Sequence, residues 1–390
     1  MEALMLVALL LLSARLSQTP QEIQARAQEL YAKGDLAEAG RLLESLVASA
    51  PEFSPARFQL GAVYLRLGRF AEAAELFESV THEHPANAEL SFRIGLAYVL
   101  ERRPAEARVH FERALGIDPA HAEAILALGQ LEGREGNYER ALALLEKAPN
   151  EPSAHYYRAA VLERMGRDEE MLRAAFRAVE LSPEDPAFRR FLGGAYLKLG
   201  KWPEAERELG AAVERGGSSP SLYLDLGSAL LHQDHVAEAQ KAYRRALDLA
   251  PDSAEALLQL GYIEWRLSSY ETAVPLLERA IEKDPNLLRA RHFLGLIALR
   301  RGDLEGAQKS FRGAVARDPS FSEGFFNLGK IALRRGDLDE AIANFERAVQ
   351  LTPDYKEAYY QLGFAHRRRG DASAAERALA RFREISEKES

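Results

Sequence analysis

The sequence contains no cysteine. That absence excludes disulfide bonds, thiolate-bound metals, a thiol nucleophile and a lipid anchor on cysteine. It leaves the cellular compartment open, because a chain without thiols is stable under reducing and oxidising conditions alike. A strong excess of one charge is also missing, since 51 Lys and Arg residues face 59 Asp and Glu residues, for a net charge of −8. We therefore expect no nucleic-acid partner.

Long hydrophobic runs are also absent, apart from one short run near the start. Leu4–Leu12 is uninterrupted apolar sequence, followed by Ser13 and Ala14. A membrane-spanning helix needs roughly 20 apolar residues, whereas a signal-peptide core has about 7–15 with small residues after it. We therefore expect residues 1–19 to be a signal peptide, which would make the protein periplasmic or secreted. Because the run is preceded by Glu2 and by no Lys or Arg, two alternatives stay open: a cytoplasmic protein with an apolar N-terminal helix, or an uncleaved membrane anchor.

Motifs of the common enzyme classes are missing as well. No G-x-S-x-G, P-loop, H-E-x-x-H or G-x-G-x-x-G pattern occurs. His82 and His84 precede a proline, and His232 and His235 lie near a predicted turn; we interpret both pairs as solvated helix ends. The sequence predicts no catalytic residue, no metal, no cofactor and no small-molecule substrate.

The sequence does contain a repeat of 34 residues. Prolines recur at this interval at Pro51, Pro85 and Pro119, and glycines recur in phase with them. The repeat also has an alanine column, which comprises Ala39, Ala73, Ala107, Ala141, Ala205, Ala239, Ala273, Ala307, Ala341 and Ala375. A fixed period of this length is the signature of a repeat architecture.

Each column of the repeat has a physical reason. Apolar residues at helical spacing predict an amphipathic first helix, and a glycine such as Gly336 ends it, because glycine adopts the left-handed conformation without a Cβ penalty. A second helix follows and stops before the proline. The small residues, such as Gly61 and Ala73, are expected where the two helices cross closely, and larger ones such as Phe77 beside them. One helix pair cannot bury both faces, so neighbouring pairs must stack.

One unit reads Phe58, Leu60-Gly61, Tyr64, Ala73, Phe77 and Pro85. In this order the residues resemble the tetratricopeptide repeat, and the resemblance covers nearly everything after residue 20. It implies an all-α fold, a right-handed solenoid of about eleven stacked antiparallel helix pairs with a concave groove.

The repeats divide the chain into three regions. Residues 20–151 hold repeats one to four, of which the fourth is four residues short. Residues 152–219 hold repeats five and six, of which the fifth is irregular, and residues 220–390 hold repeats seven to eleven. Loss of four helical residues shortens a helix by ~6 Å, so we expect poorer stacking between repeats four and five.

The resemblance also implies where a ligand would lie. The second, fifth, ninth, twelfth and thirteenth positions of each unit line the groove, and repeats eight to eleven are the most regular. The predicted site there comprises Tyr262, Trp265, Arg266, Leu296, Arg300, Phe326, Lys330, Arg334, Tyr360, Phe364 and Arg368. These residues form an apolar floor beside a row of cations. Since the arginine fork bonds carboxylates, we expect an extended protein segment with apolar and acidic residues.

Both features also have a purely structural interpretation. A cation at the thirteenth position ends a helix, where it complements the helix dipole, and aromatic residues in the floor help the repeats to stack. Trp265 is either a binding hot spot, a role in which Trp is enriched, or a packing residue. A clamp for a C-terminal carboxylate, as in chaperone-binding members of the family, is not expected, because Lys330 is the only lysine at a ninth position.

We therefore predict a non-catalytic scaffold that binds a partner protein or peptide in its groove. If the chain is exported, the family suggests a place in bacterial envelope assembly or secretion. The alternative is a substrate-recruiting or regulatory partner of a separate enzyme, such as a glycosyltransferase. Contact with a membrane is expected only for an uncleaved N-terminal anchor.

Overall fold

The computed structural model describes residues 19–389, and the expected signal core Leu4–Leu12 lies outside them. Within this range the chain is all-α, without a strand. Each repeat contributes two helices. The first helices are α2 (Pro20–Lys33), α4 (Ser54–Leu67), α6 (Ala88–Leu100), α8 (Ala122–Arg134), α10 (Pro152–Arg164), α12 (Pro186–Lys198), α14 (Pro220–His232), α16 (Ala254–Arg266), α18 (Leu288–Arg300), α20 (Ser322–Arg335) and α22 (Lys356–Arg369). The second helices are α3 (Leu36–Ser49), α5 (Phe70–Thr81), α7 (Pro104–Ile117), α9 (Tyr138–Leu145), α11 (Asp168–Leu181), α13 (Trp202–Glu214), α15 (Val236–Leu249), α17 (Tyr270–Lys283), α19 (Leu304–Arg317), α21 (Leu338–Leu351) and α23 (Ala372–Glu389).

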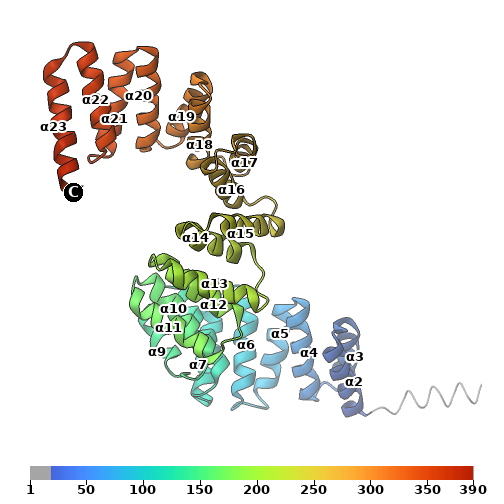
Figure 1. Ribbon diagram of the computed structural model, residues 1–390. Coiled ribbons are helices and arrows are strands. Elements are labelled where there is room, and N and C mark those ends of the chain that lie inside the picture. The colour runs from blue at the N-terminus through green and yellow to red at the C-terminus, as the bar shows by residue number, and fades with distance from the viewer. Residues whose placement is uncertain (1–18, 390) are drawn as a thin grey trace, which may run out of the picture. The chain divides into compact units, whose positions relative to one another are not determined.

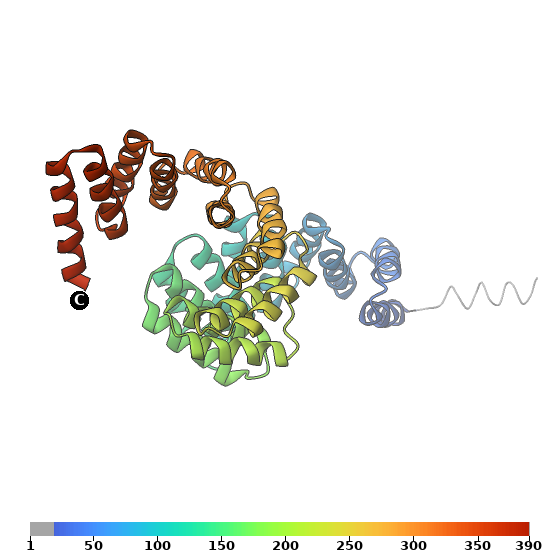
Figure 2. The same ribbon diagram turned by 45° about the horizontal axis from the view of Figure 1, so that its top comes forward.

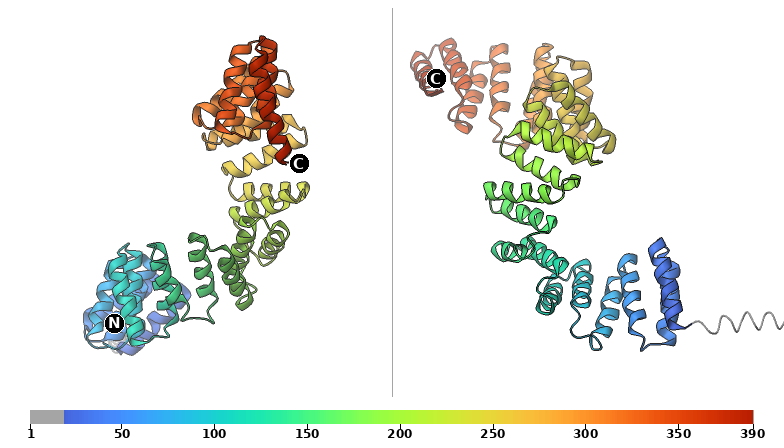
Figure 3. Two further views of the ribbon diagram at one scale, coloured as in Figure 1. Left: turned by 90° about the vertical axis from the view of Figure 1, so that its left-hand side faces the viewer. Right: turned by 60° about the horizontal axis from the view of Figure 1, so that its bottom comes forward.

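The helices belong to two compact units that divide between Ala195 and Tyr196, inside α12. We call them the N-terminal unit and the C-terminal unit. Within each unit consecutive helices lie antiparallel, and each pair packs beside the next (Figures 1 and 3). Figure 2 shows the last helices of the chain, coloured orange to red, as successive pairs of this kind. The predicted α-solenoid of about eleven units is confirmed, whereas the grouping of the repeats into three regions stays a prediction.

The alanine column forms the crossing point of the helix pair in ten of the eleven described repeats, and the buried Met171 takes this place in repeat five. Nine of its alanines are fully buried and Ala375 is 3% exposed. The partner column is glycine, because the space next to it is taken by a large side chain from the second helix. A Cβ on Gly61 would lie 2.8 Å from the ring of Phe77, and one on Gly295 would lie 2.6 Å from Phe311. The two helices therefore approach closely enough to enclose one aromatic or leucine side chain per repeat.

The first helix of every repeat ends at a residue with left-handed backbone. Most of these residues are glycines, namely Gly34, Gly68, Gly136, Gly166, Gly200, Gly302, Gly336 and Gly370. Arg102, Asp234 and Ser268 occupy the same position at φ values of 62°, 63° and 59°. A left-handed conformation costs a residue with a Cβ roughly 1–2 kcal/mol, with Asp and Asn the usual exceptions. Arg102 and Ser268 therefore retain strain that the eight glycines avoid.

Repeat four has a shortened second helix. Helix α9 has 8 residues, against 14 in α7. The segment that follows α9 supplies Ala148 to a buried cluster with Leu145 and Ala154, so the apolar core continues across the joint.

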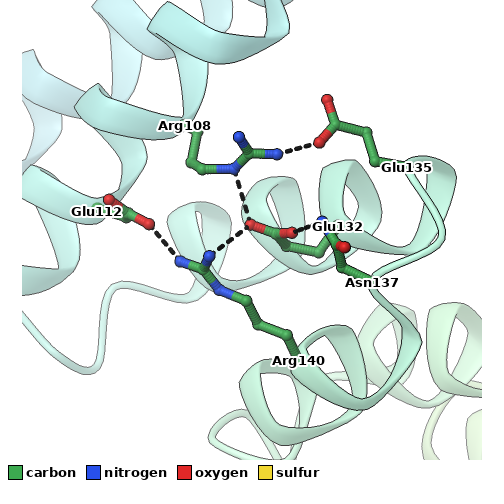
Figure 4. A network of polar contacts seen from close by, with 6 residues as sticks. All are labelled: Arg108, Glu112, Glu132, Glu135, Asn137 and Arg140. Atoms are coloured by element: carbon green, nitrogen blue, oxygen red, sulfur yellow. Dashed lines mark hydrogen bonds and ion pairs between the residues drawn. The ribbon is translucent and has the colours of Figure 1, made fainter.

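A buried carboxylate joins repeats three and four. Glu132 on α8 is fully buried, and Arg108 on α7 donates from Nε to its Oε1 at 2.9 Å (Figure 4). Asn137 Nδ2 donates to Oε2 at 2.6 Å, and Arg140 on α9 lies 3.3 Å from Oε1. Arg140 also pairs with Glu112 on α7. A buried charge is tolerated only when it is paired and hydrogen-bonded, and here the partners come from α7, from α9 and from the turn before α9.

The left-handed helix ends lead to a pair of opposite substitutions. Ser268→Gly removes the Cβ strain and should raise the free energy of unfolding by ~1 kcal/mol, whereas Gly336→Ser introduces strain and should lower it by about as much. Urea unfolding followed by circular dichroism measures both. A lower midpoint for Ser268→Gly would show that the side chain, and not the backbone, determines stability at this turn.

The Glu132 network leads to a second comparison. Glu132→Ala should destabilise the protein by about 2 kcal/mol or more, because Arg108 and Arg140 lose a buried acceptor. Glu112→Ala removes an exposed member of the same network and should cost less than about 1 kcal/mol. Equal losses in thermal or urea unfolding would contradict the assignment of Glu132 as the centre of the network.

Candidate functional site

The aromatic part of the predicted site begins with a three-ring cluster in the C-terminal unit. Tyr262 and Trp265 on α16 stack at 5.9 Å between centroids, and Phe293 on α18 lies 5.1 Å from Tyr262 and 5.0 Å from Trp265. Trp265 is only partly buried. The residue therefore packs between repeats eight and nine and still presents part of its ring at the surface.

Leu296 connects this cluster to the next repeat. It packs against the buried cluster that contains Phe293, as Tyr262 and Trp265 do, and also against the cluster that contains Leu328. Apolar packing is therefore continuous from α16 to α20.

Phe326 on α20 continues the floor. Its ring lies 5.0 Å from Tyr355 and 5.9 Å from Phe345, and Lys330 Nζ stands 5.3 Å from its centroid. This distance places the ammonium in cation–π contact with the ring. The sequence pattern places both residues in the groove, and the structure brings them into contact.

Tyr360 and Phe364 on α22 are more open. They are 50% and 45% exposed, and Tyr360 lies 5.5 Å from Phe382 on α23. Both residues therefore offer apolar surface at the last repeat.

The predicted row of cations is not uniform. Arg266 Nη2 bonds Asp234 Oδ1 at 2.7 Å, and this hydrogen bond raises the pKa of Arg266. Arg368 Nη1 donates to the Leu333 carbonyl at 3.5 Å. These two positions therefore already have partners within the chain.

The arginines at the fourteenth position of repeats nine to eleven bind the neighbouring repeat. Each binds the second helix of the preceding repeat: Arg301 with Glu271 at 3.1 Å, Arg335 with Gln308 at 2.9 Å and Arg369 with Asp339 at 3.2 Å. Adjacent arginines at one helix end thus differ in role. The fourteenth position binds the neighbouring repeat, whereas the thirteenth is the position that the repeat pattern predicts for the groove.

Arg300, Lys330 and Arg334 form what we call the cation cluster. Lys330 and Arg334 are four residues apart on α20 and therefore share a face, and Arg300 ends α18. Burial, followed by the charges of Arg334 and Arg300, lowers the pKa of the Lys330 ammonium. Within residues 19–389 no carboxylate lies within ion-pair distance of these three side chains. The cluster is therefore a concentration of positive charge without an internal counter-ion.

A second recess lies in the N-terminal unit, and we did not select it from the sequence. It has a volume of about 500 Å³ and is lined by α2, α4 and α6, with Tyr31, Phe58, Gln59 and Arg93 among its walls. The Arg93 guanidinium lies 5.5 Å from the Phe58 centroid, and Gln59 Oε1 is buried without a hydrogen-bond partner. The sequence could have indicated this recess through Ala62. It is a small residue at a ninth position, where most other repeats carry a larger one.

Three of the four histidines considered as metal ligands contact other groups. His232 stacks on Trp202 at 3.9 Å, His84 Nε2 lies 3.4 Å from Ser54 Oγ and His235 Nδ1 lies 3.3 Å from Glu206. Over residues 19–389 no group of three side chains with metal-ligand chemistry comes together. In the same range no helix combines the length and the hydropathy that crossing a membrane requires.

Searches of solved structures find several proteins of similar fold. Cut9–Hcn1 of the APC/C covers 95% of this chain and 88% of its own at 16% identity, with a TM-score of 0.48. Yeast Tom70 covers 94% and 91% at 14% identity, with a TM-score of 0.45. YrrB covers 47% and 95% at 23% identity, with a TM-score of 0.40. These likenesses are too distant to bear on function. A search of the curated proteins finds no match.

Family models give the decisive comparison. One model described as a tetratricopeptide repeat matches residues 169–221, 192–239, 224–287 and 294–356. A second model of the same description matches residues 30–93, 98–163 and 332–388. The matches cover most of the chain and agree with the helix pairs of the structure, so the chain belongs to the tetratricopeptide repeat family.

Proposed function

We propose that the protein is a non-catalytic scaffold that binds an extended segment of a partner protein along the first helices of repeats eight to eleven. The single observation that carries this proposal is the cation cluster, which lies next to the partly buried Phe326 and lacks an acidic partner. Uncompensated charge beside apolar surface suits a ligand that supplies both acidic and apolar groups.

The two kinds of contact have different roles. Apolar side chains of the partner lie against Trp265, Leu296 and Phe326, where they remove apolar surface from water and supply most of the affinity. Acidic side chains pair with Arg300 and Arg334, which are exposed and therefore act mainly in steering and selection. The charge contacts should weaken as salt rises, since screening is stronger around exposed groups.

The cellular role follows from the same proposal together with export of the chain. With Leu4–Leu12 as a signal core, the scaffold works outside the cytoplasm, in envelope assembly or secretion. N-terminal sequencing of the protein purified from its native host tests this part. A start shortly after residue 12 supports export, and a retained Met1 in a cytoplasmic fraction contradicts it.

Charge reversal in the groove is the first test of the binding surface. A partner is captured by affinity from the native host, and its binding to purified variants is then titrated. Changing both Arg300 and Arg334 to Glu should weaken binding about tenfold or more and reverse its dependence on salt.

The matched control changes Arg301 and Arg335 to Glu. It introduces the same charge one residue further along the same helices, at positions that bind the neighbouring repeat. This variant should change binding less than about threefold, while circular dichroism reports whether both variants remain folded. Equal weakening by the two double variants would show that only overall charge matters, and the groove assignment would fail.

Trp265 allows a separate test of the apolar floor. Trp265→Ala should cost ~2 kcal/mol of binding energy if its ring contacts the partner. Trp202→Ala removes the other tryptophan, which stacks on His232 between repeats six and seven, and serves as the control. Both are measured by titration at a temperature where circular dichroism shows folded protein. Unchanged affinity for Trp265→Ala would assign the residue to packing alone.

A further inference from the structure

The cation cluster is held in place by the packing beneath it. Leu296 and Leu299 on α18 pack against the cluster that contains Leu328 and Ile331 on α20. Arg300 follows Leu299 at the end of α18, and its charge acts on Lys330. The Lys330 ammonium is further positioned over the Phe326 ring at 5.3 Å. Lys330 and Arg334 therefore share one face of α20, and Arg300 ends α18 in the preceding repeat.

The charged groups around Lys330 do not compensate the positive charge of the cation cluster. Burial is the main cause that lowers the pKa of His292 on α18, and the charge of Lys330 lowers it further. Glu323 and Arg289 also act on His292, but neither contributes to the lowered pKa of Lys330, whose charged neighbours are Arg334 and Arg300. Repulsion among the three cations is therefore present in the unliganded protein, and a bound anion relieves it.

The three positive charges of the cluster favour an anion with more than one negative charge. One carboxylate neutralises one of three cations, whereas a dianion neutralises two. A phosphomonoester carries a charge of about −1.5 to −2 at pH 7, with three acceptor oxygens. Arginine forks and a lysine ammonium supply donors that match those oxygens.

We propose that Arg300, Lys330 and Arg334 form a binding site for a phosphomonoester, carried as a phosphoserine or phosphothreonine on the segment that the groove binds. The proposal rests on the proposed function of the groove and names the chemistry of its ligand. Phosphorylation of the partner then becomes the event that strengthens binding.

The surroundings favour a single phosphate over a polyanion. On one side Arg266 is already paired with Asp234, and on the other Arg368 donates to a backbone carbonyl. The Asp234 carboxylate therefore ends the row of free cations toward repeat eight, whereas Arg368, whose partner is a neutral carbonyl, keeps its charge. A nucleic acid would need the row of free cations to continue along the groove.

Small anions test the site directly in the full chain. The probes are N-acetyl-phosphoserine amide, N-acetyl-aspartic acid amide and sulfate, titrated calorimetrically at constant ionic strength and at pH 7.5 and 5.0. At pH 7.5 the phosphoserine amide should bind about tenfold or more tightly than the aspartic acid amide. At pH 5.0 its affinity should fall severalfold, because the second phosphate pKa is about 6. Sulfate stays a dianion at both pH values and should not lose affinity.

Variants assign the binding to the cluster. Lys330→Gln should weaken binding of the phosphoserine amide about tenfold, Lys330→Arg should retain most of it, and Arg301→Gln should leave it unchanged. Equal affinity for the two amides, or full binding by Lys330→Gln, would overturn the inference. Binding to vesicles that contain phosphatidic acid, without binding of the phosphoserine amide, would instead assign the cluster to a membrane surface and would also overturn it.

Failure here is distinguishable from failure of the groove itself. If the charge reversal at Arg300 and Arg334 weakens binding of the captured partner while the two amides bind with equal affinity, the groove assignment is supported, and its ligand is acidic without phosphate. If the phosphoserine amide binds but the charge reversal leaves the affinity for the partner unchanged, the anion site is supported and the groove assignment is wrong.

Discussion

The structure depends on the close crossing of two helices inside each repeat. Glycine on the first helix and alanine on the second bring the backbones together, and one large side chain, such as Phe77 against Gly61, fills the remaining space. This contact is repeated along the chain and sets the distance and angle of each pair. Because a pair buries only one of its faces, the crossing also determines how the next pair stacks.

The repeated crossing leaves the groove positions free to vary. Their side chains are not needed for the contact that holds a pair together, so they differ widely between repeats. Repeats nine and ten use this freedom to place Arg300, Lys330 and Arg334 together, while repeats one to three surround a recess whose polar wall groups are mainly uncharged. The same backbone therefore supports two surfaces of different chemistry, one in each compact unit.

Much of this fold could be predicted from the sequence, because the repeated alanines and glycines indicate the conformation and packing of the backbone. The alanine column marks the crossings, and the glycines at the helix ends mark left-handed turns, which Arg102, Asp234 and Ser268 adopt as well. The site was harder to predict. The repeat pattern places Arg300 and Arg301 next to each other but gives no indication that only Arg301 has an acidic partner, about 30 residues earlier in the chain.

The buried carboxylate of Glu132 escaped prediction for the same reason. Its three donors come from α7, from α9 and from the turn before α9. Such pairings depend on side-chain conformations across repeats, which periodicity does not encode.

The turn at Asp234 has a consequence for how such a groove can change. Asp234 ends α14 in a position that is glycine in most repeats, and from there its carboxylate pairs with Arg266 in the following repeat. Glycine and aspartate both tolerate this backbone conformation. Replacing Asp by Gly at such a helix end therefore frees an arginine of the following repeat from its partner, and the reverse replacement pairs it again. Neither change alters the neighbouring side chains or the stacking of the repeats. The charge along this row of arginines can therefore change at the turns, outside the row itself.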